Sequence, residues 1–462
     1  MELIQRTFGV ALIEAYQPSA SSDLGLRKPA RLKPAALKGA FFWLSAFYVV
    51  YCARPEDWIP GLDYIPAAKI AGLLALAGLL TSLGRTRRKF SDLPRESSYL
   101  LAMIGVLFVS AFLSPIWKGG AINSTIDFAK MYIIWVLTFL LVTDLARLRR
   151  IVYIQAASVA VISIVSIIKG HSQPRLEGVI GGIYSNPNDL AFAIVLTLPF
   201  CLAFLLTAKK ALVKLLWTGA ILIMALTLFM TASRGGFICL VISGAVCLWY
   251  FGVKGRRFYL IVTSGLAVVV LLAVAGRPLL KRMAAISGHT DTIAESTAYD
   301  SYEARKELMV IAVQGIEHYP ILGVGVGNFQ VYSGAWRDVH MTYLQIAVEG
   351  GIPSLVLYLL FFGGSFSNLR ELLRRRDLDV QTTLFVGGLY SSMIGFVVGA
   401  LFAPEAYQFF PYFAVAYTSA LVAMEREREP ASHPALAGKD SRNGRGIVRA
   451  KTTGSHDLTT VN

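Results

Sequence analysis

Long apolar segments separated by short polar ones make up most of this chain. Each segment is close to the roughly 20 residues that an α-helix needs to cross a bilayer. The pattern predicts about twelve transmembrane helices, at residues 37–53, 66–84, 97–114, 126–144, 151–169, 189–207, 212–231, 236–253, 258–276, 342–363, 381–402 and 408–424. The predicted fold class is an all-α polytopic membrane protein.

Polar tails flank this membrane region. Residues 1–36 carry no apolar run long enough to cross a bilayer and lack a cleavable signal pattern. Residues 425–462 are rich in Gly, Ser and Arg without apolar periodicity, so we expect them to be disordered. The sequence thus predicts one membrane domain, residues 37–424, between two tails.

One large loop, residues 277–341, interrupts the series of apolar segments. Asp300 and Glu303 resemble a capping box, which predicts a short helix that Pro320 ends. The run Gly323-Val324-Gly325-Val326-Gly327 follows a helix rather than a strand, so a nucleotide-binding loop is disfavoured. A tight loop packing against the membrane face is the better interpretation.

The positive charge is distributed as expected for a membrane protein. Of the 462 residues, 55% are hydrophobic and 16% charged, with a formal net charge of +15. With twelve helices, the clusters of Lys and Arg all fall on one face, which the positive-inside rule makes cytoplasmic; they include Arg85, Arg87, Arg88, Lys209, Lys210, Lys254, Arg256, Arg370 and Arg374. Both termini are then cytoplasmic, the loop 277–341 faces the other side, and no nucleic-acid partner is needed to explain the charge.

Cysteine and histidine spacing gives no metal or disulfide pattern. Cys52, Cys201, Cys239 and Cys247 lie inside apolar runs, without the spacing of metal ligands. The histidines are scattered. We therefore expect no metal site and no cofactor.

Arg234 is the strongest candidate for binding an anion. It lies in the outward turn Thr231–Gly236, where a basic residue runs against the positive-inside bias. Ser233, Gly235 and Gly236 would leave backbone N–H groups accessible at the start of the next helix, which favours an anion. A guanidinium beside such donors is suited to a diphosphate, although a snorkelling arginine is the plainer alternative.

Other outward polar residues have two possible roles each. Arg175 precedes a glycine-rich stretch that leads to Asn186 and Asn188. These asparagines either cap the next helix or contact a sugar or phosphate. Arg305 is either an ordinary surface charge or a further anion ligand. Arg54, followed by Glu56 and Asp57, is predicted to form a structural ion pair.

His340 is the candidate base. It lies where the loop meets the next apolar helix, on the same face as Arg234, and its ordinary pKa suits proton abstraction. Glu349 follows within that helix. Nine residues after His340, it projects to the opposite side of a helix, so we do not expect the two to pair. We expect Glu349 to organise either the helix interface or an arginine.

These motifs together resemble the O-antigen ligase and polymerase superfamily. The resemblance rests on Thr231–Gly236, on the Arg305 helix leading to His318–Gly325, on His340–Gly351, and on Arg175 with Asn186-Pro187-Asn188. The segment Arg54–Pro60 is similar to ligases associated with exosortase systems.

The resemblance implies a bacterial inner-membrane enzyme whose large loop and active site face the periplasm. Such enzymes move a glycan from an undecaprenyl-diphosphate carrier to an acceptor without a metal. Arg234, Arg305 and Arg175 would hold the diphosphate, with Ser233, Asn186, Asn188 and Glu349 as possible support. His340 would activate the acceptor hydroxyl, on a lipid A core sugar, a growing lipid-linked glycan or an exported protein.

Other functions stay open at this point. A polymerase of the same superfamily would use the same residues. A transporter for a lipid-linked anion would also suit twelve membrane helices, and a scaffold in an envelope complex would need neither Arg234 nor His340.

Overall fold

The computed structural model describes residues 36–170, 176, 182–184, 186–284 and 293–428. Within these residues the chain is helical and contains no strand. The α-helices are α1 (Ala36–Ala53), α2 (Ala67–Leu80), α3 (Arg95–Leu113), α4 (Lys118–Leu141), α5 (Leu145–Gly170), α6 (Pro187–Thr207), α7 (Ala211–Met230), α8 (Arg234–Leu248), α9 (Tyr259–Ala275), α10 (Arg277–Ala284), α11 (Ile293–His318), α12 (Phe329–Tyr332), α13 (Thr342–Arg374), α14 (Val380–Gly399) and α15 (Phe409–Arg428). A π-helical turn, Trp249–Val253, extends α8.

Each apolar segment predicted from the sequence is a helix here. Among the described residues, 8 helices are long and apolar enough to cross a membrane, and α2 and α9 are shorter apolar helices. The class of all-α polytopic membrane protein is therefore confirmed. The count of twelve crossings stays a prediction, because it also requires α1, α2, α9 and α15 to cross.

The expectation of only short helices in the large loop is wrong for α11. This helix has 26 residues and begins at Ile293, seven positions before the expected start at Asp300. Residues 293–299, which precede Asp300, contain neither Pro nor Gly, so no residue there interrupts a helix. It ends at His318, as expected from Pro320, which disfavours helical backbone in the residue before it.

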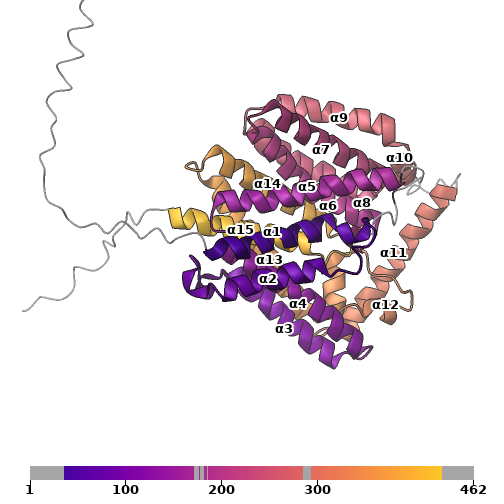
Figure 1. Cartoon of the computed structure of the whole chain (residues 1–462). Coiled ribbons are helices and arrows are strands. Elements are labelled where there is room, and N and C mark those ends of the chain that lie inside the picture. The colour runs from indigo at the N-terminus through magenta and orange to yellow at the C-terminus, as the bar shows by residue number, and fades with distance from the viewer. Residues whose placement is uncertain (1–35, 171–175, 177–181, 185, 285–292, 429–462) are drawn as a thin grey trace, which may run out of the picture.

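The helices form a bundle around α6 and α14, which pack on each other and are the most deeply buried candidate spans. In Figure 1, α7 and α9 lie along one edge of the bundle, while α3 and α4 lie along the opposite edge. Helix α11 packs on α13 and, with α12, projects at one end of the bundle (Figure 1). The start of α8 lies near α11, since Arg234 and Arg305 line the same cleft.

A kink at Gly351 divides α13 after its first turns. Gly351 has a φ of 76°, a backbone conformation that glycine tolerates best. The loop after α11 packs into the kink: the Gly325 N–H donates to the Glu349 carbonyl at 2.9 Å, and the Ile352 N–H to the Pro320 carbonyl at 2.8 Å. The glycine-alternating run is therefore a tight packing loop, as predicted; its place at the membrane face stays a prediction.

Arg88, from one of the basic clusters, is buried and not exposed to solvent. Its side chain is 2% exposed. It donates to the carbonyls of Phe139 and Val142 at the end of α4, at 2.8 and 3.0 Å, and to Glu427 of α15 at 2.8 Å. Arg88 thereby satisfies carbonyl groups that the end of a helix leaves without partners.

The tails are mostly beyond what the structure describes. Helix α15 continues to Arg428, four residues into the range assigned to the C-terminal tail, and the buried Glu425 pairs with Arg428 at 2.7 Å. The prediction of disorder for the rest of that tail, and of a cytoplasmic N-terminal tail, lies outside the described residues.

Candidate functional site

The predicted anion-binding turn forms the start of α8. Arg234 is the first residue of the helix, and Ser233 is its N-cap, accepting a hydrogen bond from the Gly236 N–H at 3.1 Å. Ala232, just before, has a φ of 50°, which tightens the turn from α7 into α8. Arg234 is thus held at the positive end of a helix dipole, a position that favours a bound anion.

The two glycines after Arg234 have a different role from the one expected. A Cβ at Gly235 would lie 2.9 Å from the Cβ of Phe402, and one at Gly236 would lie 2.6 Å from the Cβ of Ala191. Both positions therefore need glycine so that α8 can approach its neighbours closely. The expectation that the Gly236 N–H is available to an anion is wrong, since Ser233 accepts its hydrogen bond.

Of the two asparagines at the start of α6, one is the helix cap. Asn186 is the N-cap of α6, and its side chain accepts from the Asn188 N–H at 2.9 Å. Asn188 is not a cap. Its Oδ1 accepts a hydrogen bond from the Ser233 hydroxyl at 2.7 Å, which joins the start of α6 to the start of α8.

A narrow cleft brings the predicted residues together. Arg234 from α8, Arg305 from α11 and Asn188 from α6 all line it, together with Phe192, Ala232, Ser233, Gly235, Gly236, Phe402 and Ala403. Both arginines are half-buried. The free volume is about 20 Å³, which is room for about one water molecule. Two arginines that are far apart in the sequence thus line one small space.

His340 lies at the end of the loop, immediately before α13. Its Nδ1–H donates to the Asp338 carbonyl at 2.9 Å, which leaves Nε2 as the basic nitrogen of the neutral ring. Burial and the positive charge of Arg305 lower the pKa of His340 to about 4, against a smaller opposing effect of the Asp338 carbonyl. The ring is therefore neutral at pH 7, and a weaker base than its ordinary pKa implies.

The loop between α14 and α15 connects His340 to the cleft, and sequence reasoning missed it. Thr342, two residues after His340, donates from its N–H to the Ala400 carbonyl at 2.8 Å and from its hydroxyl to the Ala403 carbonyl at 2.7 Å. Ala403 and its neighbour Phe402 line the cleft. The first turn of α13 is thereby fixed against the cleft wall.

A second missed feature of this loop is the buried Glu405. Its N–H donates to the Thr342 hydroxyl at 3.0 Å. Burial raises the pKa of Glu405 well above its usual range, and the neighbouring Asp189 carboxyl, next to Asn188, raises it further. The available signal was a single carboxylate, in Ala403-Pro404-Glu405, between two apolar segments.

A comparison with protein families found one match. Residues 219–359 match the family model described as O-antigen ligase. This segment of the chain is therefore similar to O-antigen ligases. No curated protein matches the chain. The match indicates a membrane protein that transfers glycosyl groups, with a lipid-linked glycan donor and a glycan acceptor.

The O-antigen ligase match covers most of the candidate residues. Arg234, Arg305 and His340 all lie within it, whereas Asn188 and Phe402 line the same cleft from outside the matched segment. Arg175, the third predicted diphosphate ligand, lies outside the described residues. Among the described residues, no group of three or more His, Cys, Asp or Glu side chains could hold a metal ion.

Glu349 lies within the matched segment but is not among the residues that line the cleft. It is fully buried in α13, where its carboxyl group adjoins the Tyr407 hydroxyl. Its backbone carbonyl accepts from the Ser110 hydroxyl at 3.0 Å and from the Gly325 N–H at 2.9 Å. These contacts join α13 to α3 and to the packing loop. Glu349 thus lies at an interface between helices.

The predicted ion pair of Arg54 is confirmed. Its guanidinium bonds to Asp57 through two nitrogens, one of them at 3.1 Å, and lies 3.6 Å from Glu56. It also packs on Gly182, where an added Cβ would clash with the Arg54 guanidinium. Arg54 thus braces the turn Gly182–Tyr184 that leads into α6.

Proposed function

We propose that this protein transfers a glycan from an undecaprenyl-diphosphate carrier to an acceptor hydroxyl at the periplasmic face of the bacterial inner membrane. The observation that carries the proposal is the place of Arg305. It lines the cleft beside Arg234, and its charge also lowers the pKa of His340. An anion site and a neutral base therefore lie within electrostatic reach of each other.

Arg234 and Arg305 bind the donor diphosphate in this proposal, and Arg175 adds a third cation. A guanidinium presents paired N–H donors that match phosphate oxygens, and the start of α8 adds its dipole. The present free volume is too small for a diphosphate, so the arginine side chains rotate outward as the donor enters. Arg305 lies on α11, which packs on α13.

His340 acts on the acceptor. Its neutral Nε2 accepts the proton of the acceptor hydroxyl while that oxygen forms a bond to C1 of the donor sugar. The bond between C1 and the diphosphate oxygen breaks, and the diphosphate leaves with the electron pair. Arg234 and Arg305 stabilise the charge that develops there, so no metal is needed for this task.

The proposed topology follows the charge pattern. Twelve membrane helices would leave both termini in the cytoplasm and the loop 277–341 in the periplasm. The cleft, His340 and α11 then share the periplasmic face, where a lipid-linked glycan and its acceptor can meet.

A transfer assay in proteoliposomes tests the proposal. Wild type, His340→Ala and a matched control, His318→Ala, are supplied with undecaprenyl-diphosphate-linked glycan and each of three acceptors. His318 is an exposed histidine of the same loop. Wild type and His318→Ala should transfer glycan, and His340→Ala should lose about 10²- to 10⁴-fold in rate.

The products separate the two activities of the superfamily. Glycan on a lipid A core or protein acceptor identifies a ligase, whereas longer lipid-linked chains identify a polymerase. EDTA should leave either activity intact. Absence of transfer by wild type with every acceptor, or an EDTA loss that magnesium restores, would contradict the proposal.

A further inference from the structure

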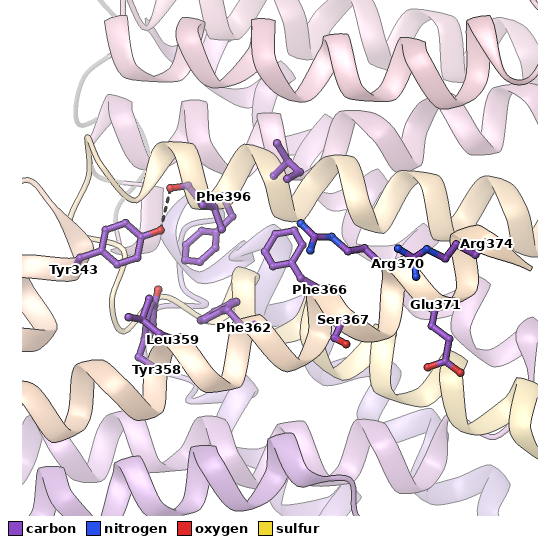
Figure 2. A pocket seen from close by; sticks show the side chains of 13 residues that line it. Tyr343, Tyr358, Leu359, Phe362, Phe366, Ser367, Arg370, Glu371, Arg374 and Phe396 are labelled. Carbon is purple, nitrogen blue, oxygen red and sulfur yellow. Dashed lines mark hydrogen bonds between the residues drawn. The ribbon is translucent and has the colours of Figure 1, made fainter.

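A second site runs along α13 and ends far from His340. A groove of about 880 Å³ runs between α13 and α14. Figure 2 shows Tyr343 at one end of the groove and Arg370 and Arg374 at the other, with Phe362 and Phe366 between them. Tyr343 is in the first turn of α13 and Arg374 is its last residue. The groove therefore follows the helix almost from one membrane face to the other.

The floor of the groove is a single face of α13. Leu359, Phe362, Phe366, Arg370 and Arg374 follow one another at intervals of three and four residues, the spacing that aligns side chains on one side of a helix. The face is apolar and aromatic through the middle of the membrane and becomes cationic over its last two turns. An amphipathic molecule with an anionic head matches that order.

The charge at the inner end is available to a ligand. Arg370 and Arg374 are exposed, and neither forms a hydrogen bond or a salt bridge with another residue in the part of the chain that the structure describes. Glu371 also lines the groove and is the one opposing charge among its lining residues. Two guanidinium groups one helical turn apart still leave a net positive end, which suits one phosphate group.

We propose that this groove binds an anionic phospholipid of the leaflet opposite to His340. The phosphate lies between Arg370 and Arg374, and the acyl chains lie over Phe366, Phe362 and Leu359. The candidate active site is at the other end of α13, so this lipid is not the glycan donor. It would fill the gap between α13 and α14 and hold the lower part of α13 in place.

Lipid binding to the delipidated, purified full-length protein tests the proposal. Native mass spectrometry would compare phosphatidylglycerol with phosphatidylcholine of the same acyl chains. The variants are Arg370→Ala/Arg374→Ala and a control, Lys209→Ala/Lys210→Ala, which removes two exposed charges from the same predicted face, away from the groove. Thermal unfolding without lipid checks that all variants fold.

The expected result is phosphatidylglycerol binding that falls by about fivefold for each arginine removed. The lysine control should bind like wild type, and excess inorganic phosphate should not compete, because it cannot occupy the apolar part. Three results would each overturn the proposal: equal binding of the two lipids to wild type, unchanged phosphatidylglycerol binding by the arginine variant, or an equal loss in the lysine control.

Discussion

Ser233 donates a hydrogen bond of 2.7 Å to Asn188, and this bond joins the first turns of α8 and α6. The same hydroxyl accepts from the Gly236 N–H at 3.1 Å. One serine therefore caps the helix that begins with Arg234 and also fixes that helix against its neighbour. The position of the Arg234 guanidinium depends on both bonds.

Replacing Ser233 should affect stability and donor binding together. Ser233→Ala removes an N-cap, which costs about 1 kcal/mol, and it also removes the contact with Asn188. We expect a lower unfolding temperature and a higher KM for the donor. Asn186→Ala is the matched control, since it removes the N-cap of α6 but not a residue that lines the cleft. A donor KM that rises equally in both variants would contradict this account of Ser233.

The charge and shape of Arg234 should both matter. We expect Arg234→Ala to lower kcat/KM by about 10²- to 10³-fold, in the range found when one group that stabilises a developing oxyanion is removed. Arg234→Lys should retain part of the activity, because an ammonium keeps the charge but cannot form the paired hydrogen bonds of a guanidinium. Steady-state kinetics at several donor concentrations would measure this. Near wild-type activity of both variants would exclude a diphosphate clamp at this position.

The pH dependence should report on the contact between Arg305 and His340. The base is active when neutral, so kcat should fall as the pH drops through the pKa of His340, which burial and Arg305 lower to about 4. Arg305→Gln removes a positive neighbour and raises that pKa, so the acidic limb of the profile should move to higher pH. At pH 7 the ring stays neutral, and any loss of activity there reflects weaker donor binding.

Arg337 gives the control for this shift. It is exposed and has a smaller effect than Arg305 on the pKa of His340. Arg337→Gln should therefore move the acidic limb in the same direction by less, without the loss at pH 7. If the acidic limb does not move in Arg305→Gln, Arg305 does not affect the pKa of His340, and this account is wrong.

The close approach of α8 to α6 can be tested with two glycines of one helix. An added methyl at Gly236 would lie 2.6 Å from the Cβ of Ala191, whereas nothing lies within 4 Å of one at Gly244. Gly236→Ala should destabilise the protein by about 1–3 kcal/mol through overpacking. Gly244→Ala should be neutral or stabilising by about 0.5–1 kcal/mol, since alanine favours a helix. Chemical unfolding in detergent would compare them, and equal effects would argue against a tight contact at Gly236.

The membrane helices could be predicted because each must be apolar over a fixed length. The start of α11 could not, because the residues from Ile293 onward are polar and amphipathic, and a capping pattern at Asp300 occurs inside the helix. The length of α13 was underestimated for a similar reason. Its last turns carry Arg370 and Arg374, which end the apolar run but not the helix.

The candidate site was predictable only in part. Arg234 and His340 were conspicuous as polar residues at the outer ends of apolar segments. That Arg305 shares a cleft with Arg234 depends on how α11 packs against the bundle, and local pattern carries no information about such packing. The role of the loop with Phe402 and Glu405 was not predicted, because the loop is short and carries no recognisable motif. Its single carboxylate between two apolar segments was the one signal available.

The most direct test of the central claim separates donor binding from transfer. Binding of undecaprenyl-diphosphate-linked glycan would be measured beside single-turnover transfer for wild type, His340→Ala and Arg234→Ala. The account predicts that His340→Ala binds the donor within about twofold of wild type but transfers it at least about 10²-fold more slowly, while Arg234→Ala loses donor binding. Transfer by His340→Ala at the wild-type rate, or a loss of donor binding as large as that of Arg234→Ala, would contradict the division of roles between the base and the arginines.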